Sequence, residues 1–203
     1  SSEKKAKLGI VNEETPIVKD DTGLFGYFQS EKYFKHIEDT IRSEFKFDET
    51  TIKDCTEKIK SVRGDDDTVV VSLHVRLGDY KMLKHVFVPL VKTSYYQQAI
   101  TYMNNEFGKK IKFIIFSDEP ETCKQVFQGE NLVFAEGGSQ VQDMCLMSMC
   151  DHNIIANSSF SWWGAWLNEN ENKKVIAPQN WFVPTEKDPK SSQDIYIDNW
   201  LVL

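Results

Sequence analysis

The stretch Thr68-Val-Val-Val-Ser-Leu-His-Val-Arg-Leu-Gly-Asp-Tyr80 decides the fold of this 203-residue chain. Its β-branched, apolar first part, residues 68–75, has the length and composition of a strand buried on both faces of a parallel sheet. Segments with helix and strand patterns alternate after it. Strands are predicted over 111–116, 132–134, 153–156 and 175–177, and helices over 95–107, 119–127, 141–149 and 160–167.

This alternation implies right-handed βαβ crossovers, so we expect an α/β fold with a doubly wound, Rossmann-like parallel sheet and flanking helices. The residues upstream have a helical pattern, with helices predicted over 30–42 and after Asp48. Their predicted inward-facing residues are Tyr33, Phe34, Ile37 and Ile41 in the first helix and Ile52, Cys55 and Ile59 in the second. Because the run 63–67 (Arg-Gly-Asp-Asp-Asp) interrupts this pattern, we predict a domain boundary there, between a helical segment 1–66 and a Rossmann-like domain over 67–203.

Composition excludes several classes of protein. Lys and Arg total 24 against 31 Asp and Glu, a net charge of −7, which disfavours nucleic acid or an anionic membrane as a partner. No apolar run approaches the roughly 20 residues of a membrane-spanning helix, so we expect no stable membrane insertion. The four cysteines are sparse and lie mostly in helical patterns, as buried thiols do in a reducing compartment, and we expect no disulfide.

Polar clusters follow four of the predicted strands, at residues 74–80, 117–119, 135–138 and 157–161. Ligands of doubly wound sheets bind at the carboxyl ends of the strands, so these clusters are the candidate site. Arg76 directly follows a buried strand and lies near a glycine, and its guanidinium can bind two phosphate oxygens at once. The alternative is a purely structural ion pair between Arg76 and Asp79.

The cluster Asn157-Ser-Ser-Phe-Ser161 lies between a strand and a helix. The free N–H groups at a helix start, together with the serine hydroxyls, can hold a phosphate without a side-chain cation. No Lys or Arg occurs from Gln142 through Asn172, so an anion there depends on dipoles and on Arg76. Helix capping by Ser158 or Ser159 is the structural alternative, and the two roles are compatible.

Other candidates also have two interpretations. Asp118 and Glu119 either cap a helix or accept hydrogen bonds from a base or ribose. His85 and His152 are either general bases or structural residues. The tryptophans at 162, 163 and 166 are expected mainly in core packing, with a sugar ring or base as the alternative contact.

No convincing metal site or common catalytic motif is present in the sequence. The acidic run 65–67 precedes a strand, whereas the D-x-D of metal-dependent sugar transferases follows one. Cys145, Cys150 and His152 lack zinc-ligand spacing. The nucleophile elbow of serine hydrolases, the P-loop and the G-x-G-x-x-G fingerprint are all missing.

Several segments stand out when they are taken together: Gly26-Tyr-Phe-Gln-Ser-Glu-Lys-Tyr-Phe34, His74-Val-Arg-Leu-Gly-Asp-Tyr80, Tyr95-Tyr96, Phe116-Ser-Asp-Glu119 and 143–168 with its block Asn157-Ser-Ser-Phe-Ser-Trp-Trp-Gly-Ala-Trp-Leu-Asn168. From about Gly23 onward they resemble the α-1,2-fucosyltransferase family, glycosyltransferase family 11. The resemblance implies a GT-B-type architecture and transfer of L-fucose from GDP-β-L-fucose to the 2-hydroxyl of a galactose-type acceptor glycan. It also implies inversion at the transferred sugar and no required metal or cofactor.

The resemblance also implies roles for particular residues. Arg76 would hold the β-phosphate, and His74 would help to place the nucleotide. Asp118 or Glu119 would contact the guanosine. The turn of Asn157, Ser158, Ser159 and Phe160 would bind the diphosphate. Apart from the resemblance, Asp79 and His85 closely follow Arg76 in the sequence, and one of them is the expected catalytic base.

Two departures from the family pattern bear on activity. The second arginine of the related H-x-R-R-G-D motif is Leu77 here, so donor binding would have one fewer cation unless Lys81 or Lys84 substitutes. The Gly-rich segment that opens family members has no counterpart, so we expect residues 1–66 to match only the end of the acceptor-side domain.

Two alternatives to catalysis remain: a nucleotide-sugar-binding domain or truncated fragment without activity, and a carbohydrate-binding module that uses the three tryptophans. The chain looks more like the cytosolic bacterial members of the family than like the membrane-anchored Golgi members. Asn157-Ser-Ser159 would be a formal glycosylation site inside the donor pocket, which also favours the cytoplasm.

Overall fold

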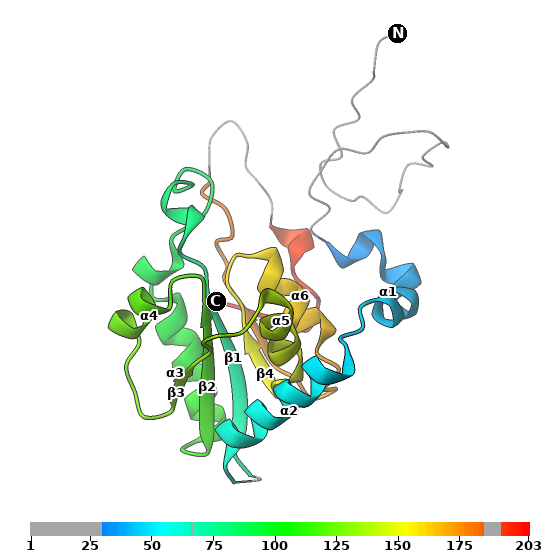
Figure 1. The fold of residues 1–203 in the computed structure, drawn as a ribbon. Coiled ribbons are helices and arrows are strands. Elements are labelled where there is room, and N and C mark those ends of the chain that lie inside the picture. Colours follow the sequence, from blue (N-terminus) through cyan, green and yellow to red (C-terminus); the bar gives the residue numbers. More distant parts are fainter. Residues whose placement is uncertain (1–29, 66, 185–191) are drawn as a thin grey trace.

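A six-stranded, all-parallel sheet forms the centre of the protein in a computed structural model that describes residues 30–65, 67–184 and 192–203 (Figure 1). The strands are β1 (Val69–Val75), β2 (Ile111–Ser117), β3 (Leu132–Phe134), β4 (His152–Ile154), β5 (Val175–Ala177) and β6 (Leu201–Val202). Their spatial order is β3-β2-β1-β4-β5-β6, and all neighbouring pairs are parallel. This order is that of a doubly wound Rossmann sheet, so the predicted fold class is confirmed.

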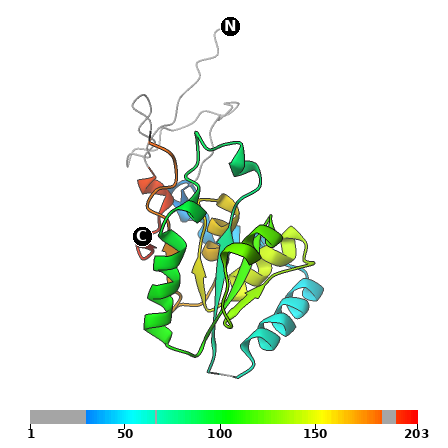
Figure 2. The same ribbon diagram turned by 90° about the vertical axis from the view of Figure 1, so that its left-hand side faces the viewer.

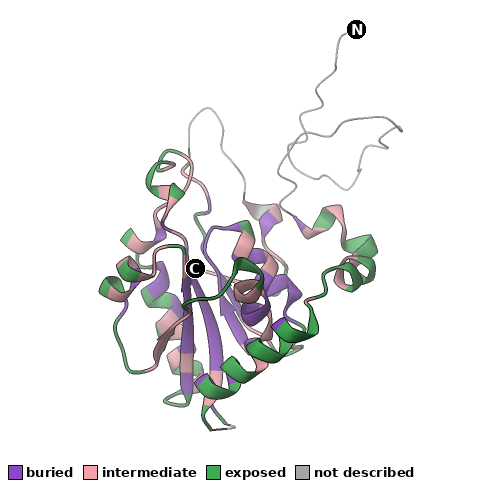
Figure 3. Ribbon diagram, in the orientation of Figure 1, coloured by how far each residue is buried: buried purple, intermediate pink, exposed green. Residues whose placement is uncertain are grey.

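Helices cover both faces of the sheet. They are α1 (Glu38–Glu44), α2 (Glu49–Arg63), α3 (Tyr95–Phe107), α4 (Pro120–Val126), α5 (Gln140–Met149) and α6 (Ser159–Leu167). Helices α3 and α4 pack on one face, whereas α2, α5 and α6 pack on the other, and Figure 2 shows α3 in green and α2 in cyan on opposite sides of the sheet. The central strands are therefore buried on both sides, as Figure 3 shows in purple.

The alternation of side chains along β1 determines which residues reach which face. Val71, Leu73 and Val75 belong to the core beneath α3, and Val70 belongs to the core beneath α2 and α5. Successive side chains of a strand point to opposite faces, so His74 shares the α5 and α6 side with Val70. Contact between the rings of His74 and Phe160, the second residue of α6, agrees with this placement.

The predicted helix over 30–42 is wrong in its first part. The segment contains two short 3₁₀ turns, Glu31–Tyr33 and Lys35–Ile37, before α1 begins. Ser30 caps only the first turn, with its Oγ accepting from the Lys32 amide at 3.3 Å. Phe34 interrupts the helical path with a φ of −134°, and Ile37, predicted to face inward, is 43% exposed.

The inward face of α2 was predicted with one error. Cys55 and Ile59 are buried as expected, but Ile52 is 43% exposed and Thr51 is buried in its place. Asp48 caps the helix by accepting from the Thr51 amide at 2.9 Å, and the buried stripe continues from Thr51 at helical spacing. Ile52 lies one residue out of that stripe, about 100° around the helix.

The predicted domain boundary stays a prediction, because residues 1–29 and 66 lie outside the described residues, as do Gly26 to Gln29 of the first family-like segment. Within the described chain, α2 packs against α5 and shares a core with β1 and β2. Gly64 ends α2 with a φ of +72°, a backbone conformation that residues with a Cβ rarely adopt.

In the described part of the chain, no helix combines the length and apolarity needed to cross a membrane. All four cysteines are buried, free thiols.

Candidate active site

A cavity of about 820 Å³ opens at the carboxyl ends of β1, β2 and β4. It lies at the switch point of the sheet, between β1 and β4, where the strand order reverses and where doubly wound proteins bind their ligands. Seven predicted site residues line this cavity: His74, Arg76, Asp79, Asp118, Ser158, Ser159 and Phe160. Three others, His85, Glu119 and Asn157, do not.

Arg76 lines the cavity while bound to two carboxylates. Its Nη2 lies 2.9 Å from Oδ1 of Asp79, and its Nη1 lies 3.2 Å from Oδ2 of Asp118. The predicted structural pairing with Asp79 is therefore present, and it holds the guanidinium at the cavity edge with 32% of the side chain exposed. Phosphate binding by Arg76 stays a prediction that this position permits.

Asp118 ties the loop after β1 to the loop after β2. Its Oδ1 accepts from the Leu77 amide at 2.9 Å, and its Oδ2 accepts from the Gly78 amide at 3.0 Å. A Cβ on Gly78 would lie 2.5 Å from that Oδ2, so only glycine allows this close approach. The Asp118 carboxylate is thus largely used in shaping the loop that carries Arg76.

Glu119 has a different environment from Asp118. It ion-pairs with Lys81 and accepts from the Thr122 hydroxyl at 3.1 Å. Helix α4 begins at Pro120, and Glu119, at the capping position before it, makes no side-chain cap hydrogen bond, so the capping interpretation of Asp118 and Glu119 is contradicted. Proline at the first helical position needs no amide partner, which removes one of the donors that a cap would satisfy.

His74 is the most deeply buried polar group of the cavity lining, with 4% of the residue exposed. Its Nδ1 is buried and has no hydrogen-bond partner in the structure. Burial, with a smaller contribution from the Arg76 charge, lowers the pKa of His74 to about 3, so the imidazole is neutral at physiological pH. A buried polar atom without a partner is costly, and a ligand that hydrogen-bonds to Nδ1 would relieve that cost.

The start of α6 lines the same cavity as Arg76. Ser158 caps the helix, with its Oγ accepting from the Phe160 amide at 3.3 Å, so the predicted capping is confirmed. Ser159 is exposed, and Ser158 and Ser159 both line the cavity. Ser161 has an internal role, because its Oγ accepts from the Ala156 amide at 3.1 Å. The cap uses the Phe160 N–H, so an anion at the start of α6 would bind to the other N–H groups of the first turn.

Asn157 lies behind the cavity wall and is 1% exposed. Its Nδ2 donates to the carbonyls of Val88 and Trp181, both at 3.0 Å. Its carbonyl accepts from the Tyr80 hydroxyl at 2.7 Å. Asn157 thus supports the cavity and does not face it.

The two predicted histidine bases lie outside the cavity lining. His85 is exposed on the loop after β1. His152 begins β4 at the opposite edge of the sheet, where its Nδ1 accepts from the Lys174 amide at 3.0 Å and its ring stacks on Phe107. His152 therefore has the structural role that was its alternative interpretation.

The tryptophans are core residues. Trp162 and Trp166 are 5% and 2% exposed. Trp163 is covered on its ring by Phe34, stacked at 5.2 Å, and by Phe45, stacked at 5.1 Å. Burial covers the indoles of Trp162 and Trp166, and stacked rings cover that of Trp163, so no indole face is open to a sugar. The predicted core packing is confirmed, and the carbohydrate-binding module that uses these tryptophans is contradicted.

Sequence reasoning missed part of the cavity lining. Tyr80, Phe87 and Phe182 form an aromatic side, and Gln140 and Asp143 contribute from the start of α5. Burial raises the pKa of Asp143 above its ordinary value. The capping-box spacing of Ser139 and Gln142 could have located the start of α5, but no local pattern pairs Phe87 with Phe182.

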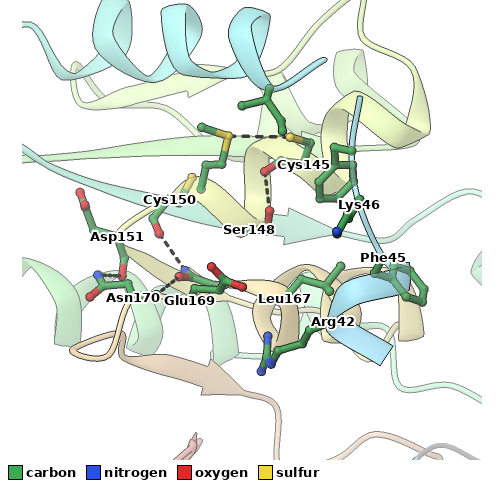
Figure 4. Close-up of a pocket in the computed structure, with 14 residues that line it drawn as sticks. Arg42, Phe45, Lys46, Cys145, Ser148, Cys150, Asp151, Leu167, Glu169 and Asn170 are labelled. Carbon is green, nitrogen blue, oxygen red and sulfur yellow. Dashed lines mark hydrogen bonds between the residues drawn. The ribbon is translucent and has the colours of Figure 1, made fainter. Parts of the chain in front are cut away.

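A second cavity, of about 650 Å³, lies near the amino-terminal edge of β4, between the α1–α2 connection and the ends of α5 and α6 (Figure 4). Its polar groups largely serve the protein itself: Asn170 donates to the Asp151 carbonyl at 3.0 Å, and the Arg42 guanidinium stacks over Trp166 at 3.9 Å. Cys145 and Cys150 also line it. Among the described residues, no group of three or more His, Cys, Asp or Glu side chains is placed to hold a metal ion.

The parallel sheet and its switch-point cavity place the chain among Rossmann-like α/β proteins. Within that class, the chain belongs to glycosyl transferase family 11, whose model matches residues 17–203. The predicted resemblance is therefore confirmed, and with it membership of a family of sugar-transferring enzymes.

Individual relatives agree with the family. The chain is 35% identical over 196 residues to an α-1,2-colitosyltransferase of Escherichia coli, covering 91% of this chain and 63% of that protein. It is 27% identical over 155 residues to galactoside α-(1,2)-fucosyltransferase 1 of Bos taurus, covering 71% and 43%. A solved family 9 glycosyl transferase from Veillonella parvula aligns with a TM-score of 0.49 at 14% identity, covering 78% and 41%. The chain thus spans less than two thirds of the length of these relatives.

Proposed function

We propose that this chain carries the donor-binding part of a fucosyltransferase that moves L-fucose, or a closely related deoxy sugar, from its GDP derivative to the 2-hydroxyl of a galactose-type acceptor glycan. The observation that carries the proposal is that Arg76 and the start of α6 face one cavity at the switch point of the sheet. The family match and the α-1,2-transferring relatives support it.

Leaving-group stabilisation is the main task of this site. In an inverting transfer, negative charge builds on the GDP while the sugar becomes oxocarbenium-like. Arg76 supplies a fixed cation, and the N–H groups at Ser159 and beyond supply dipoles, which together stabilise that charge without a metal. Among the described residues that line the cavity, Arg76 is the only lysine or arginine. Leu77 replaces the second arginine of the related motif, and its side chain lies in the core. Lys81, a candidate substitute, pairs with Glu119.

The guanine base fits the side of the cavity formed by α5. The Watson–Crick edge of guanine presents two neighbouring N–H donors, and the Asp143 carboxylate can accept both. Gln140, one turn earlier, offers an amide beside it. Adenine has no such pair of donors, so this assignment predicts selectivity for GDP over ADP.

Asp79 is the better placed of the two expected catalytic bases. It lies in the cavity lining, whereas His85 does not. The Arg76 contact orients the Asp79 carboxylate, and 56% of its side chain remains exposed towards an incoming acceptor hydroxyl. General-base catalysis needs such a carboxylate within hydrogen-bond reach of that hydroxyl.

Calorimetric titration with GDP and ADP, in a chelating buffer, tests the proposal. Wild type should bind GDP and not ADP. Arg76→Ala should weaken GDP binding by roughly 10- to 100-fold, the value of a charge-assisted contact. Lys92→Ala, at an exposed lysine outside the cavity lining, should not weaken it. Unchanged affinity in Arg76→Ala would remove Arg76 as the phosphate residue, and no GDP binding by wild type would refute the donor assignment.

A nucleotide-sugar-binding domain without catalysis is the second candidate. It is favoured by Leu77 in place of a second arginine. Tight GDP binding combined with no sugar transfer to any galactoside would support this candidate. Transfer of a sugar from the GDP donor to a galactoside would exclude it.

We further propose a cytoplasmic location. The four cysteines are free and buried, which suits a reducing compartment. The Asn157 amide of the formal glycosylation site Asn157-Ser-Ser159 is buried and makes two hydrogen bonds, so a glycan there would disrupt the cavity wall.

A further inference from the structure

One side of the cavity is apolar and is built from two segments far apart in the sequence. We call it the apolar wall and define it as Tyr80, Leu83, Val86, Phe87 and Phe182. The rings of Tyr80 and Phe87 stack with centroids 4.1 Å apart and nearly parallel planes, and Phe182 lies 5.6 Å from Phe87.

Backbone contacts fix the apolar wall in place. Phe87 and Phe182 pair in an antiparallel bridge, and the Val183 amide donates to the Val86 carbonyl at 2.8 Å. Asn157 binds both segments through the carbonyls of Val88 and Trp181. The apolar wall is therefore organised before any ligand arrives, which is how specificity surfaces are usually built.

The rest of the cavity lining is polar apart from Phe116 on β2 and Phe160 in α6, and its polar groups are already assigned. The start of α5 offers Asp143 to a base, and Arg76 with the start of α6 offers charge and dipoles to a diphosphate. A nucleotide diphosphate sugar has one further part, the sugar ring. The remaining side of the cavity, the apolar wall, is the surface left for it.

Resting on the proposed function, we infer that the apolar wall packs against the C6 methyl group of the donor sugar and that Phe87 selects a 6-deoxy sugar over one with a C6 hydroxyl. Fucose and colitose both carry a methyl group at C6. A hydroxyl there would be pressed against aromatic and aliphatic carbon and would lose its water without gaining a partner. The same surface would accept either deoxy sugar, because they differ at C3.

GDP-L-fucose and GDP-L-galactose differ only by a hydroxyl at C6, so this pair of donors tests the inference. Dissociation constants for GDP and for both donors are measured on the full chain by calorimetry. Wild type should prefer GDP-L-fucose by about 10- to 100-fold, the range that an apolar pocket achieves against one added hydroxyl. Phe87→Ser should reduce that preference to within about threefold, whereas Phe87→Leu, which stays apolar, should keep most of it.

The controls separate the inference from the proposed function. Phe45→Ser removes a phenylalanine that is 43% exposed and outside the cavity lining, and it should leave the preference unchanged. GDP itself should bind Phe87→Ser and wild type equally, because base and phosphates contact other residues. If Phe87→Ser does not fold, Phe182→Thr takes its place.

Each outcome has a distinct meaning. Loss of preference in Phe87→Ser with intact GDP binding supports the inference. A wild-type preference near one, or an unchanged preference in Phe87→Ser, overturns it while GDP binding still supports the proposed function. Absence of GDP binding by wild type overturns both.

Discussion

An arginine–aspartate pair lies at each end of β1. The two pairs differ in whether the arginine also lines a cavity. At the amino end, Asp151 accepts from the Val70 amide at 2.7 Å and pairs with Arg63 at 2.9 Å. At the carboxyl end, Asp118 accepts from two amides and pairs with Arg76. Exposure is similar, at 24% for the Arg63 side chain and 32% for that of Arg76.

The surroundings make the difference between these pairs. Arg63 also donates to the Thr68 carbonyl, so its guanidinium connects α2 with the residues just before β1 and β4. Arg76 faces the 820 Å³ cavity beside the start of α6. The same pair of residue types therefore joins structural elements at one edge of the sheet and places a cation in the lining of a cavity at the other. Ion pairing alone does not separate a structural arginine from a functional one.

The largest effect that follows from this comparison concerns stability. Asp151→Asn should lower the free energy of unfolding by about 2–3 kcal/mol, because it leaves Arg63 without its counter-charge and puts an amide donor near the Val70 N–H. GDP affinity should stay unchanged, because Asp151 lies at the opposite edge from the cavity. Urea unfolding and calorimetry on the same preparation measure both quantities. Asp65→Asn, at an exposed residue of the neighbouring loop, is the matched control.

A smaller effect concerns pH and the unpartnered His74. Its pKa in the folded state, about 3, lies below the unfolded value of 6.5, so the unfolded chain takes up a proton first. The stability contribution is complete above about pH 6.5 and is lost as pH falls, by about 1.4 kcal/mol per pH unit. Urea unfolding at about pH 7 and about pH 5 should show this loss in wild type and a shallower loss in His74→Gln. Equal slopes would mean that His74 ionises without cost in the folded protein.

The sequence could predict the sheet because the run 68–75 is rich in β-branched and apolar residues and contains no Lys, Arg, Asp or Glu, which is typical of a strand covered on both sides. It could not predict that Ile52 lies off the buried stripe of α2, because the stripe depends on packing against α5. The clusters at 74–80 and 157–161 located the cavity because each follows a predicted strand, and parallel strands bring their carboxyl ends together.

The remaining parts of the site depend on contacts between distant segments. The sequence predicts Asn157 as a ligand-binding residue, yet its side-chain amide donates hydrogen bonds to the carbonyls of Val88 and Trp181. The bridge of Phe87 to Phe182 joins segments that no local pattern relates. Tertiary hydrogen bonds of this kind have no signature in a single sequence, so the apolar wall becomes visible only in the structure.

The smallest of the three effects tests the carboxyl-end pair directly. Asp118→Asn keeps the shape of the side chain but removes the charge beside Arg76 and places an amide donor near the Leu77 and Gly78 N–H groups. The loop should then hold Arg76 less well, and GDP affinity should fall about tenfold, with a smaller change in the free energy of unfolding than in Asp151→Asn.

A double-mutant cycle shows whether Asp118 acts through Arg76 or on the nucleotide itself. If Asp118 positions Arg76, Asp118→Asn should cost GDP affinity in wild type and almost nothing once Arg76→Ala is present. If Asp118 contacts the nucleotide independently, the two losses should add. Additive losses would therefore break the parallel between the two ends of β1, because Asp151 lies at the opposite edge of the sheet from this cavity, and would return Asp118 to the role of a guanosine-binding residue.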